Sequence, residues 1–164
     1  MRFAQGEIYH VVNRGVDGRN IFMNGGDYRR FLRVLQEFNS PKAKELRHIV
    51  NTEVRPPYSQ RRGDRSLVSV LAYCLMKNHV HLLIYVHDPK DTSLFLQKVF
   101  GGYTMYFNTK YKRCGVLFQG RARARHIHEE SYFHHVMNYI HLNALDYVDK
   151  RRREHGIRNI RTAK

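Results

Sequence analysis

The sequence predicts an α+β fold in which helices pack on an antiparallel sheet, close to a ferredoxin-like or RRM-like arrangement. Two observations carry this prediction. Apolar periodicities follow one another along the chain in the order strand, helix, strand, strand, helix, strand, helix. The 164 residues, of which 42% are hydrophobic, suffice for one compact core but are too few for two.

The N-terminal part is expected to hold a strand, a turn and a helix. Residues 6–14 are mostly β-branched and aromatic, which predicts the strand. Residues 16–26 are rich in Gly, Asn and Asp and predict the turn. Residues 27–39 repeat apolar side chains at helical spacing. A long basic connection over 39–66 follows, in which residues 42–50 are a candidate short helix.

The middle of the chain predicts a hairpin and a second helix. Residues 67–76 and 79–86 are apolar strands joined by a two-residue Lys-Asn turn. The sequence D-T-S at 91–93 is expected to cap a helix over 93–112, whose apolar side chains recur at helical spacing.

The charge of the chain points to a polyanionic partner. With 29 basic and 14 acidic residues the net charge is +15, which favours nucleic acid or an anionic membrane surface. Nucleic acid is the stronger prediction, because the chain has no run of about 18 apolar residues and no apolar N-terminal stretch typical of a signal peptide. The basic residues 150–164 form either a solubilising tail or an arm that follows phosphates. Two cysteines without CxxC spacing indicate a reduced, cytoplasmic protein.

The first candidate site lies on the second strand of the hairpin. His79 and His81 are two residues apart, so both imidazoles project from one face of a strand. Val80, Leu82 and Ile84 then project from the other face, where a helix can cover them. Two imidazoles on one face provide two ligands of a metal site. The ordinary alternative is a pair of partly exposed sheet histidines.

The final predicted helix, over residues 131–145, carries a polar stripe. At about 100° per residue, Tyr139 and Asn143 lie one turn apart on one edge of the helix. Tyr132 and His135 lie on the same stripe. A tyrosine and an amide that lie one helical turn apart can place a nucleophilic oxygen and a metal-binding oxygen close to the same point. The alternatives are an ordinary amphipathic surface helix and, for Asn143, a hydrogen bond at the helix end.

Three arginines alternate near a short predicted strand at 125–128. On an extended chain, the guanidinium groups of Arg121, Arg123 and Arg125 share one face that suits phosphates.

The helix over 93–112 carries an aromatic stripe and a pair of glycines. The stripe is expected to be mostly core, although exposed members could stack on unpaired bases. Gly101 and Gly102 each cost roughly 1 kcal/mol against Ala, which indicates either close packing or the close approach of a DNA backbone. The stripe consists of Tyr103, Tyr106, Phe107 and Tyr111.

Four sequence blocks follow one another over roughly residues 6–147. They are Y-H-V-V-N-R-G (9–15), A-Y-C-L-M-K-N-H-V-H-L-L-I (72–84), G-V-L-F-Q-G-R (115–121) and Y-I-H-L-N (139–143). Together they resemble the single-tyrosine, His-hydrophobic-His (HUH) transposases of insertion sequences, and especially the REP-associated tyrosine transposase group. The tyrosine follows the histidine pair, unlike in conjugative relaxases, and no second tyrosine lies four residues away, unlike in many rolling-circle initiators.

The resemblance implies a role for each candidate residue. It makes His79 and His81 the metal-binding histidines, Asn143 the helix residue that completes the metal site, and Tyr139 the nucleophile. The mixed N,N,O ligand set suits Mg²⁺ or Mn²⁺. The expected substrate is single-stranded or hairpin DNA, cleaved and rejoined through a covalent 5′-phosphotyrosine intermediate.

We therefore predict one catalytic domain over residues 1–149, with the basic insert 39–66 and the basic tail 150–164. The chain departs from the family where Ala144-Leu145 replaces the usual Pro-Val, and where the insert is longer than usual. No membrane partner is expected, and both a monomer and a homodimer with shared sites remain open. The DNA-binding candidates are Arg14, Lys77, Arg121, Arg123 and Arg125.

The rival prediction is a non-catalytic nucleic-acid-binding module, such as a domesticated transposase or an RNA-binding sheet domain. It explains the charge and the sheet equally well. It gives no reason for two histidines, a tyrosine and an asparagine to occur at these spacings, so the strand transferase is the main prediction.

Overall fold

The computed structural model describes residues 2–41 and 65–148, without the side chains of 144–148. The strands and helices occur in the predicted order, so the α+β prediction is confirmed. The candidate helix at 42–50, most of the basic insert and the basic tail lie outside the described residues. The elements are β1 (Ile8–Arg14), a short 3-10 turn η1 (Val16–Gly18), α1 (Gly25–Glu37), β2 (Val68–Met76), β3 (His79–Val86), α2 (Pro89–Lys110), β4 (Arg123–Ile127) and α3 (Glu130–Val148).

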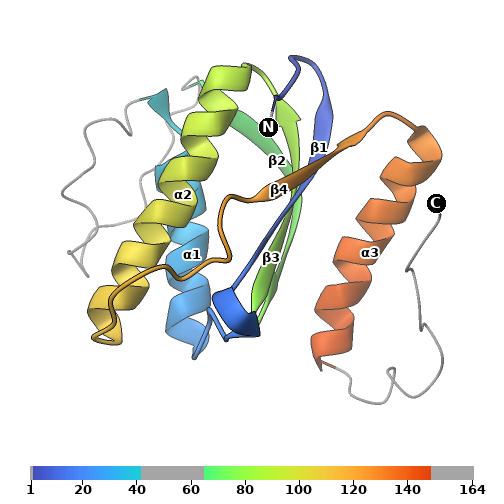
Figure 1. Ribbon diagram of the computed structural model, residues 1–164. Coiled ribbons are helices and arrows are strands. Elements are labelled where there is room, and N and C mark those ends of the chain that lie inside the picture. Colours follow the sequence, from blue (N-terminus) through green and yellow to red (C-terminus); the bar gives the residue numbers. More distant parts are fainter. Residues whose placement is uncertain (1, 42–64, 149–164) are drawn as a thin grey trace.

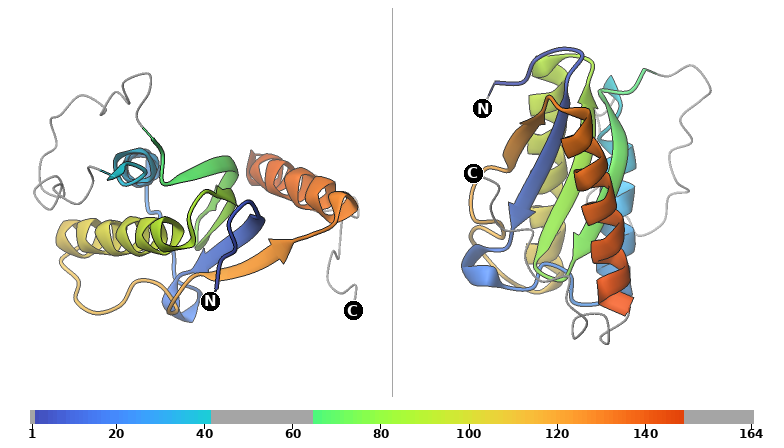
Figure 2. Two further views of the ribbon diagram at one scale, coloured as in Figure 1. Left: turned by 90° about the horizontal axis from the view of Figure 1, so that it is seen from above. Right: turned by 90° about the vertical axis from the view of Figure 1, so that its right-hand side faces the viewer.

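The sheet has the strand order β2-β3-β1-β4, and all three neighbouring pairs are antiparallel. This is the strand order of the ferredoxin-like arrangement. The predicted two-residue turn is present, because Met76 of β2 pairs with His79 of β3. Helices α1 and α2 cover one face of the sheet, and α3 lies alone across the other (Figures 1 and 2). The two faces of the sheet therefore differ, because two helices pack on one face and a single described helix packs on the other.

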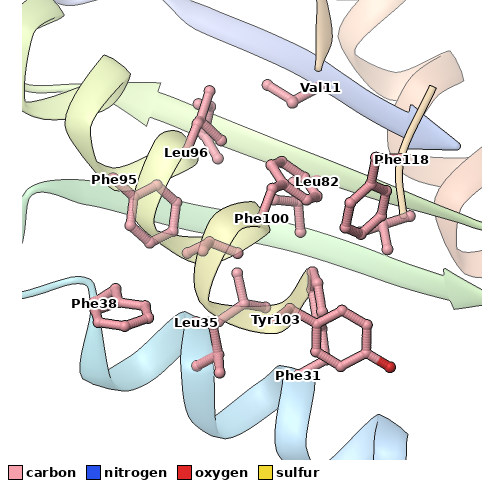
Figure 3. Packing of buried hydrophobic residues seen from close by; sticks show 14 of the residues in the cluster. Val11, Phe31, Leu35, Phe38, Leu82, Phe95, Leu96, Phe100, Tyr103 and Phe118 are labelled. Atoms are coloured by element: carbon pink, nitrogen blue, oxygen red, sulfur yellow. The ribbon is translucent and has the colours of Figure 1, made fainter. Parts of the chain in front are cut away.

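The larger core lies between the sheet and the α1–α2 layer. Its centre is aromatic, with Phe31 of α1 and Phe95 and Tyr103 of α2 fully buried (Figure 3). From β3, Leu82 and Ile84 enter this core, as the alternation of the sequence predicts. A smaller apolar cluster lies under α3 on the opposite face. The strand β3 is therefore covered on both faces, which makes it the natural support of a rigid site.

Helix α2 begins earlier than the sequence predicts, and the expected cap at 91–93 is wrong. The helix starts at Pro89, and the side chain of Asp88 accepts a hydrogen bond of 2.7 Å from the backbone N–H of Lys90. Proline fits the first helical position because its missing N–H would have no partner there. Thr92 lies inside the first turn, where its hydroxyl donates to the carbonyl of Asp88 at 2.8 Å.

The buried carboxylate of Asp27 joins the start of α1 to the end of α2. Its oxygens accept hydrogen bonds from Lys110 Nζ at 2.6 Å, Tyr111 OH at 2.7 Å, Tyr106 OH at 3.0 Å and the backbone N–H of Met23 at 2.8 Å. Burial alone would raise the pKa of Asp27, but these hydrogen bonds hold it below its usual value. The aromatic stripe therefore serves packing and this hydrogen-bonded cluster, as the core prediction expected.

Packing explains one of the two adjacent glycines in α2. A Cβ at Gly102 would lie 2.5 Å from the ring of Phe38, which is itself buried, whereas a Cβ at Gly101 would meet nothing within 4 Å. We expect Gly102→Ala to lower the free energy of unfolding by about 1–3 kcal/mol through overpacking. The matched variant Gly101→Ala should raise it by up to about 1 kcal/mol, because alanine is the better helix former. Urea denaturation of both variants measures this difference, and equal stabilities would contradict the packing argument.

Candidate functional site

His79 and His81 project from β3 toward α3, on the face opposite the larger core. The centroids of their rings are 4.8 Å apart, with the ring planes at 78°. His81 is only 5% exposed and His79 is half-buried. Val80, between them, is fully buried in the larger core. The prediction that the two imidazoles share one face is confirmed.

Burial keeps these imidazoles neutral. Burial, together with the neighbouring His79 and His10, lowers the pKa of His81 to about 3. Burial also lowers the pKa of His10 to about 4, with a contribution from Arg125. The pKa of His79 is lowered by burial and by Arg14. Neutral rings retain the nitrogen lone pair that a metal ion requires.

Helix α3 brings Tyr139 against the histidines. The ring of Tyr139 lies edge-on to His81, with centroids 5.4 Å apart, and 6.5 Å from the ring of His10. The rotation of α3 is set by Val136 and Ile140, which are buried in the smaller apolar cluster against the sheet. Tyr139 remains partly exposed at the side of this contact. The structure thus brings the predicted histidines and the predicted tyrosine together.

Asn143 lies one helical turn after Tyr139, within the helix. Because α3 continues to Val148, Asn143 does not cap the helix end, and the Ala144-Leu145 departure does not terminate the helix. Nδ2 of Asn143 and Nε2 of His81 are buried, and neither has a hydrogen-bond partner among the residues that the structure describes. Turning the amide by 180° places its oxygen at that position. Two buried polar atoms without partners are expected where a ligand is missing from a site.

The donor set of this face fits a hard divalent cation. Two neutral imidazoles and one amide oxygen are the ligands that Mg²⁺ or Mn²⁺ accepts alongside water or phosphate oxygens. The described part of the chain contains no group of three or more His, Cys, Asp or Glu side chains that could hold a metal. The amide of Asn143 is the candidate for the third protein ligand.

Two polar neighbours of the histidine pair, Asn78 and His10, were not predicted from the sequence as parts of the site. Nδ1 of His79 lies 2.6 Å from Oδ1 of Asn78, whose Nδ2 donates to the carbonyl of Gly18 at 3.3 Å. Nδ1 of His81 lies 2.9 Å from Nε2 of His10 on the neighbouring strand. The sequence predicted Asn78 only as a residue of the turn between the two strands. His10 could be found only by knowing that β1 pairs with β3.

Basic side chains surround this face of the sheet. Arg14 is paired with His79 across β1 and β3, so both project toward α3. Arg125 on β4 projects to the same face, where its guanidinium carbon lies 4.4 Å from the centre of the Tyr132 ring. All five predicted DNA-binding side chains are exposed, namely Arg14, Lys77, Arg121, Arg123 and Arg125.

The prediction that three alternating arginines share one face of a strand is wrong for Arg121. Strand β4 begins at Arg123, two residues before the predicted strand over 125–128, and does not include Arg121. The preceding segment bends around the end of β1, where the backbone N–H of Gln119 donates to the carbonyl of Arg14 at 2.8 Å. Gly120 turns the chain there with a φ of +119°. Arg121 follows this turn and takes no part in the strand alternation.

Comparison with known proteins assigns the family. A family model described as transposase IS200 like matches residues 46–143, which is more than half of the chain. The chain belongs to the IS200-like transposases. The matched segment contains both histidines, Tyr139 and Asn143, but not β1 with His10. A comparison with curated proteins found no match.

A solved structure supports the same fold for this transposase. It is described as a REP-associated tyrosine transposase bound to a REP hairpin, with a TM-score of 0.57 and 12% sequence identity. The match covers 90% of this chain and 72% of the other. At this identity the likeness concerns the fold, which agrees with the α+β arrangement described above. The predicted family is confirmed, and with it a role in enzymatic DNA transposition. Among the described residues, no helix is long and apolar enough to cross a membrane.

Proposed function

We propose that this IS200-like transposase cleaves and rejoins single-stranded or hairpin DNA through a covalent 5′-phosphotyrosine on Tyr139. The observation that carries the proposal is the contact between the Tyr139 ring and the buried ring of His81. It puts a potential nucleophile beside a neutral imidazole whose Nε2 has no hydrogen-bond partner in the described part of the chain. A purely DNA-binding module has no need for this combination.

The tyrosine supplies the covalent chemistry. The phenolic oxygen of Tyr139 attacks the scissile phosphorus and loses its proton to solvent, and a new oxygen–phosphorus bond forms. The bond from phosphorus to the 3′ oxygen breaks, and that oxygen takes up a proton and leaves as a 3′-hydroxyl. One phosphodiester replaces another, so the step needs no ATP. Attack by a second 3′-hydroxyl reverses the step and joins new ends.

Three side chains are suited to hold the divalent cation. His79 and His81 would bind it through Nε2, and Asn143 through its amide oxygen. When bound, Mg²⁺ or Mn²⁺ polarises the scissile phosphate and offsets the negative charge that develops on it.

Hairpin DNA is the substrate class that we favour. The structural neighbour was determined bound to a REP hairpin, and the net charge of +15 suits a nucleic acid. Arg14 lies beside the histidine pair, so it is placed to bind a phosphate next to the scissile one. Arg123 and Arg125 extend this basic surface along β4.

The proposal is tested by incubating the protein with end-labelled hairpins and single strands in the presence of Mn²⁺. We expect a protein–DNA species that survives denaturation and carries the label of the strand 3′ to the cut. The same reaction in EDTA should give none. A protein that binds every hairpin tightly yet never forms this species with Mn²⁺ would instead be a binding module.

Asn143 provides a separate prediction. Asn143→Ala should raise the Mn²⁺ concentration needed for half-maximal cleavage by roughly tenfold, because one of three protein ligands is lost, while metal-free DNA binding stays nearly intact. Asn138→Ala is the matched control, since Asn138 is an exposed asparagine of the same helix. A Mn²⁺ titration of cleavage measures both. An Asn143→Ala protein that is only less heat-stable, with the metal dependence of wild type, would remove Asn143 from the site.

A further inference from the structure

The two histidines of the candidate site are each held through the same ring nitrogen. Asn78 holds Nδ1 of His79, and His10 holds Nδ1 of His81. In both rings this leaves Nε2 as the nitrogen directed away from the support. For His81, Nε2 is buried and has no partner among the described residues.

The direction of the first hydrogen bond is fixed by chemistry. The amide of Asn78 donates through Nδ2 to the carbonyl of Gly18, so its oxygen faces His79. An amide oxygen can only accept a hydrogen bond. The proton of His79 is therefore on Nδ1, and its lone pair is on Nε2. His79 is thereby prepared to act as a ligand through Nε2.

The second hydrogen bond joins two imidazoles, so its direction depends on where the proton lies. If His10 donated, His81 would carry its own proton on Nε2, which would bury an N–H that has no acceptor. If His10 accepts, the proton of His81 is on Nδ1 and a lone pair occupies the buried Nε2. Only the second arrangement gives His81 the same ligand atom as His79.

We infer that His10 is a positioning residue, which accepts the Nδ1–H of His81 and so presents the Nε2 lone pair of His81 to the divalent cation. The inference rests on the proposed function, because it assigns the partner of a proposed ligand. His10 is well placed for this role. Its ring is nearly parallel to the ring of His81, with centroids 5.1 Å apart and planes at 16°, as an in-plane hydrogen bond between the two imidazoles requires, and it also lies edge-on to Tyr139. Outer partners of this kind fix the tautomer and the orientation of metal-binding histidines.

Two variants separate the hydrogen bond from the packing. His10→Phe keeps an aromatic ring beside His81 but has no acceptor, whereas His10→Gln keeps an acceptor and loses the ring. Mn²⁺ binding to the full chain without DNA is measured from the electron paramagnetic resonance signal of free Mn²⁺. We expect the Mn²⁺ Kd of the Phe variant to rise roughly tenfold to a hundredfold, and that of the Gln variant to stay within about threefold of wild type. Equal Kd values for Phe and wild type, or equal losses in Phe and Gln, would overturn the inference.

The tautomer of His81 can be observed without any variant. Long-range ¹H–¹⁵N correlation spectra of the wild-type protein, without metal or DNA, should show His81 protonated on Nδ1. Protonation on Nε2 would mean that His10 donates, and the inference would be wrong. In the Phe variant, the spectrum should shift toward the Nε2–H form, because nothing then holds the proton on Nδ1.

These measurements are independent of the DNA reaction. If the wild-type protein forms no covalent adduct but the Mn²⁺ and tautomer results are as expected, the proposed function fails and the role of His10 stands. If the adduct forms but the Mn²⁺ Kd of His10→Phe equals that of wild type, the proposed function stands and the role of His10 fails.

Discussion

Replacement of Tyr139 by phenylalanine is expected to abolish the covalent protein–DNA adduct while DNA binding is retained. The substitution removes only the phenolic oxygen and leaves the ring that packs edge-on against His81. Loss of the nucleophile should lower cleavage by several orders of magnitude, as expected when a covalent step is removed. Gel analysis of labelled hairpin DNA after denaturation measures the adduct, and a filter-binding assay without metal measures the affinity.

Tyr132→Phe is the matched control for this experiment. Tyr132 belongs to the same helix and the same polar stripe, but its ring is engaged by the guanidinium of Arg125 and packs against the smaller apolar cluster. Phenylalanine preserves both contacts, so this variant should form the adduct at close to the wild-type level. An adduct that persists in Tyr139→Phe and disappears in Tyr132→Phe would assign the nucleophile to Tyr132.

The second large effect is expected at Asp27. Asp27→Ala should lower the free energy of unfolding by about 3–5 kcal/mol, because the change removes the acceptor shared by Lys110, two tyrosines and the backbone. The side chain of Asp27 is fully buried, whereas that of Lys110 is 33% exposed and can turn to water. Most of the loss should therefore come from the partly buried N–H and phenol groups that are left without an acceptor, and it should fall near the lower end of that range.

Two further variants test the origin of this loss. Asp27→Asn keeps an oxygen acceptor without the charge and should recover part of the stability. Asp91→Ala removes an acid from an exposed ion pair with Arg65, at 2.9 Å, and should change stability by less than about 1 kcal/mol. Urea denaturation measures all three proteins. An Asp27→Ala protein as stable as Asp91→Ala would show that the buried cluster contributes nothing.

Much of the fold could be predicted because its signals are local. The alternation of β3 placed Val80 and Leu82 in the core and the two histidines on the other face, as found. The period of α3 placed Tyr139 on the stripe that contacts His81. Strand and helix periodicities act over a few residues, so they can be seen in the sequence without the tertiary structure.

Several features that the sequence did not reveal depend on contacts between distant parts of the chain. The partner of His81 depends on the pairing of β1 with β3, which no local pattern specifies. Asp27 looks like an ordinary acidic residue in the first turn of a helix, and only the folded chain brings Lys110 to it. Arg121 was expected on the same strand face as Arg123 and Arg125 because the alternation of the sequence continues through a bend, where the N–H of Gln119 donates to the carbonyl of Arg14.

Three separate segments of the chain contribute residues to the candidate site. His10 comes from the first strand, the histidine pair from the central hairpin, and Tyr139 from the last helix, which alone covers its face of the sheet (Figure 1). While the protein is being synthesised, the sheet and the α1–α2 layer can assemble before α3 has left the ribosome. Until then the histidines face solvent and no tyrosine lies beside them. On the proposed function, we expect a chain truncated before α3 to bind DNA on its basic surface but not to cut it, so the capacity to break a strand would arise only when α3 has been synthesised.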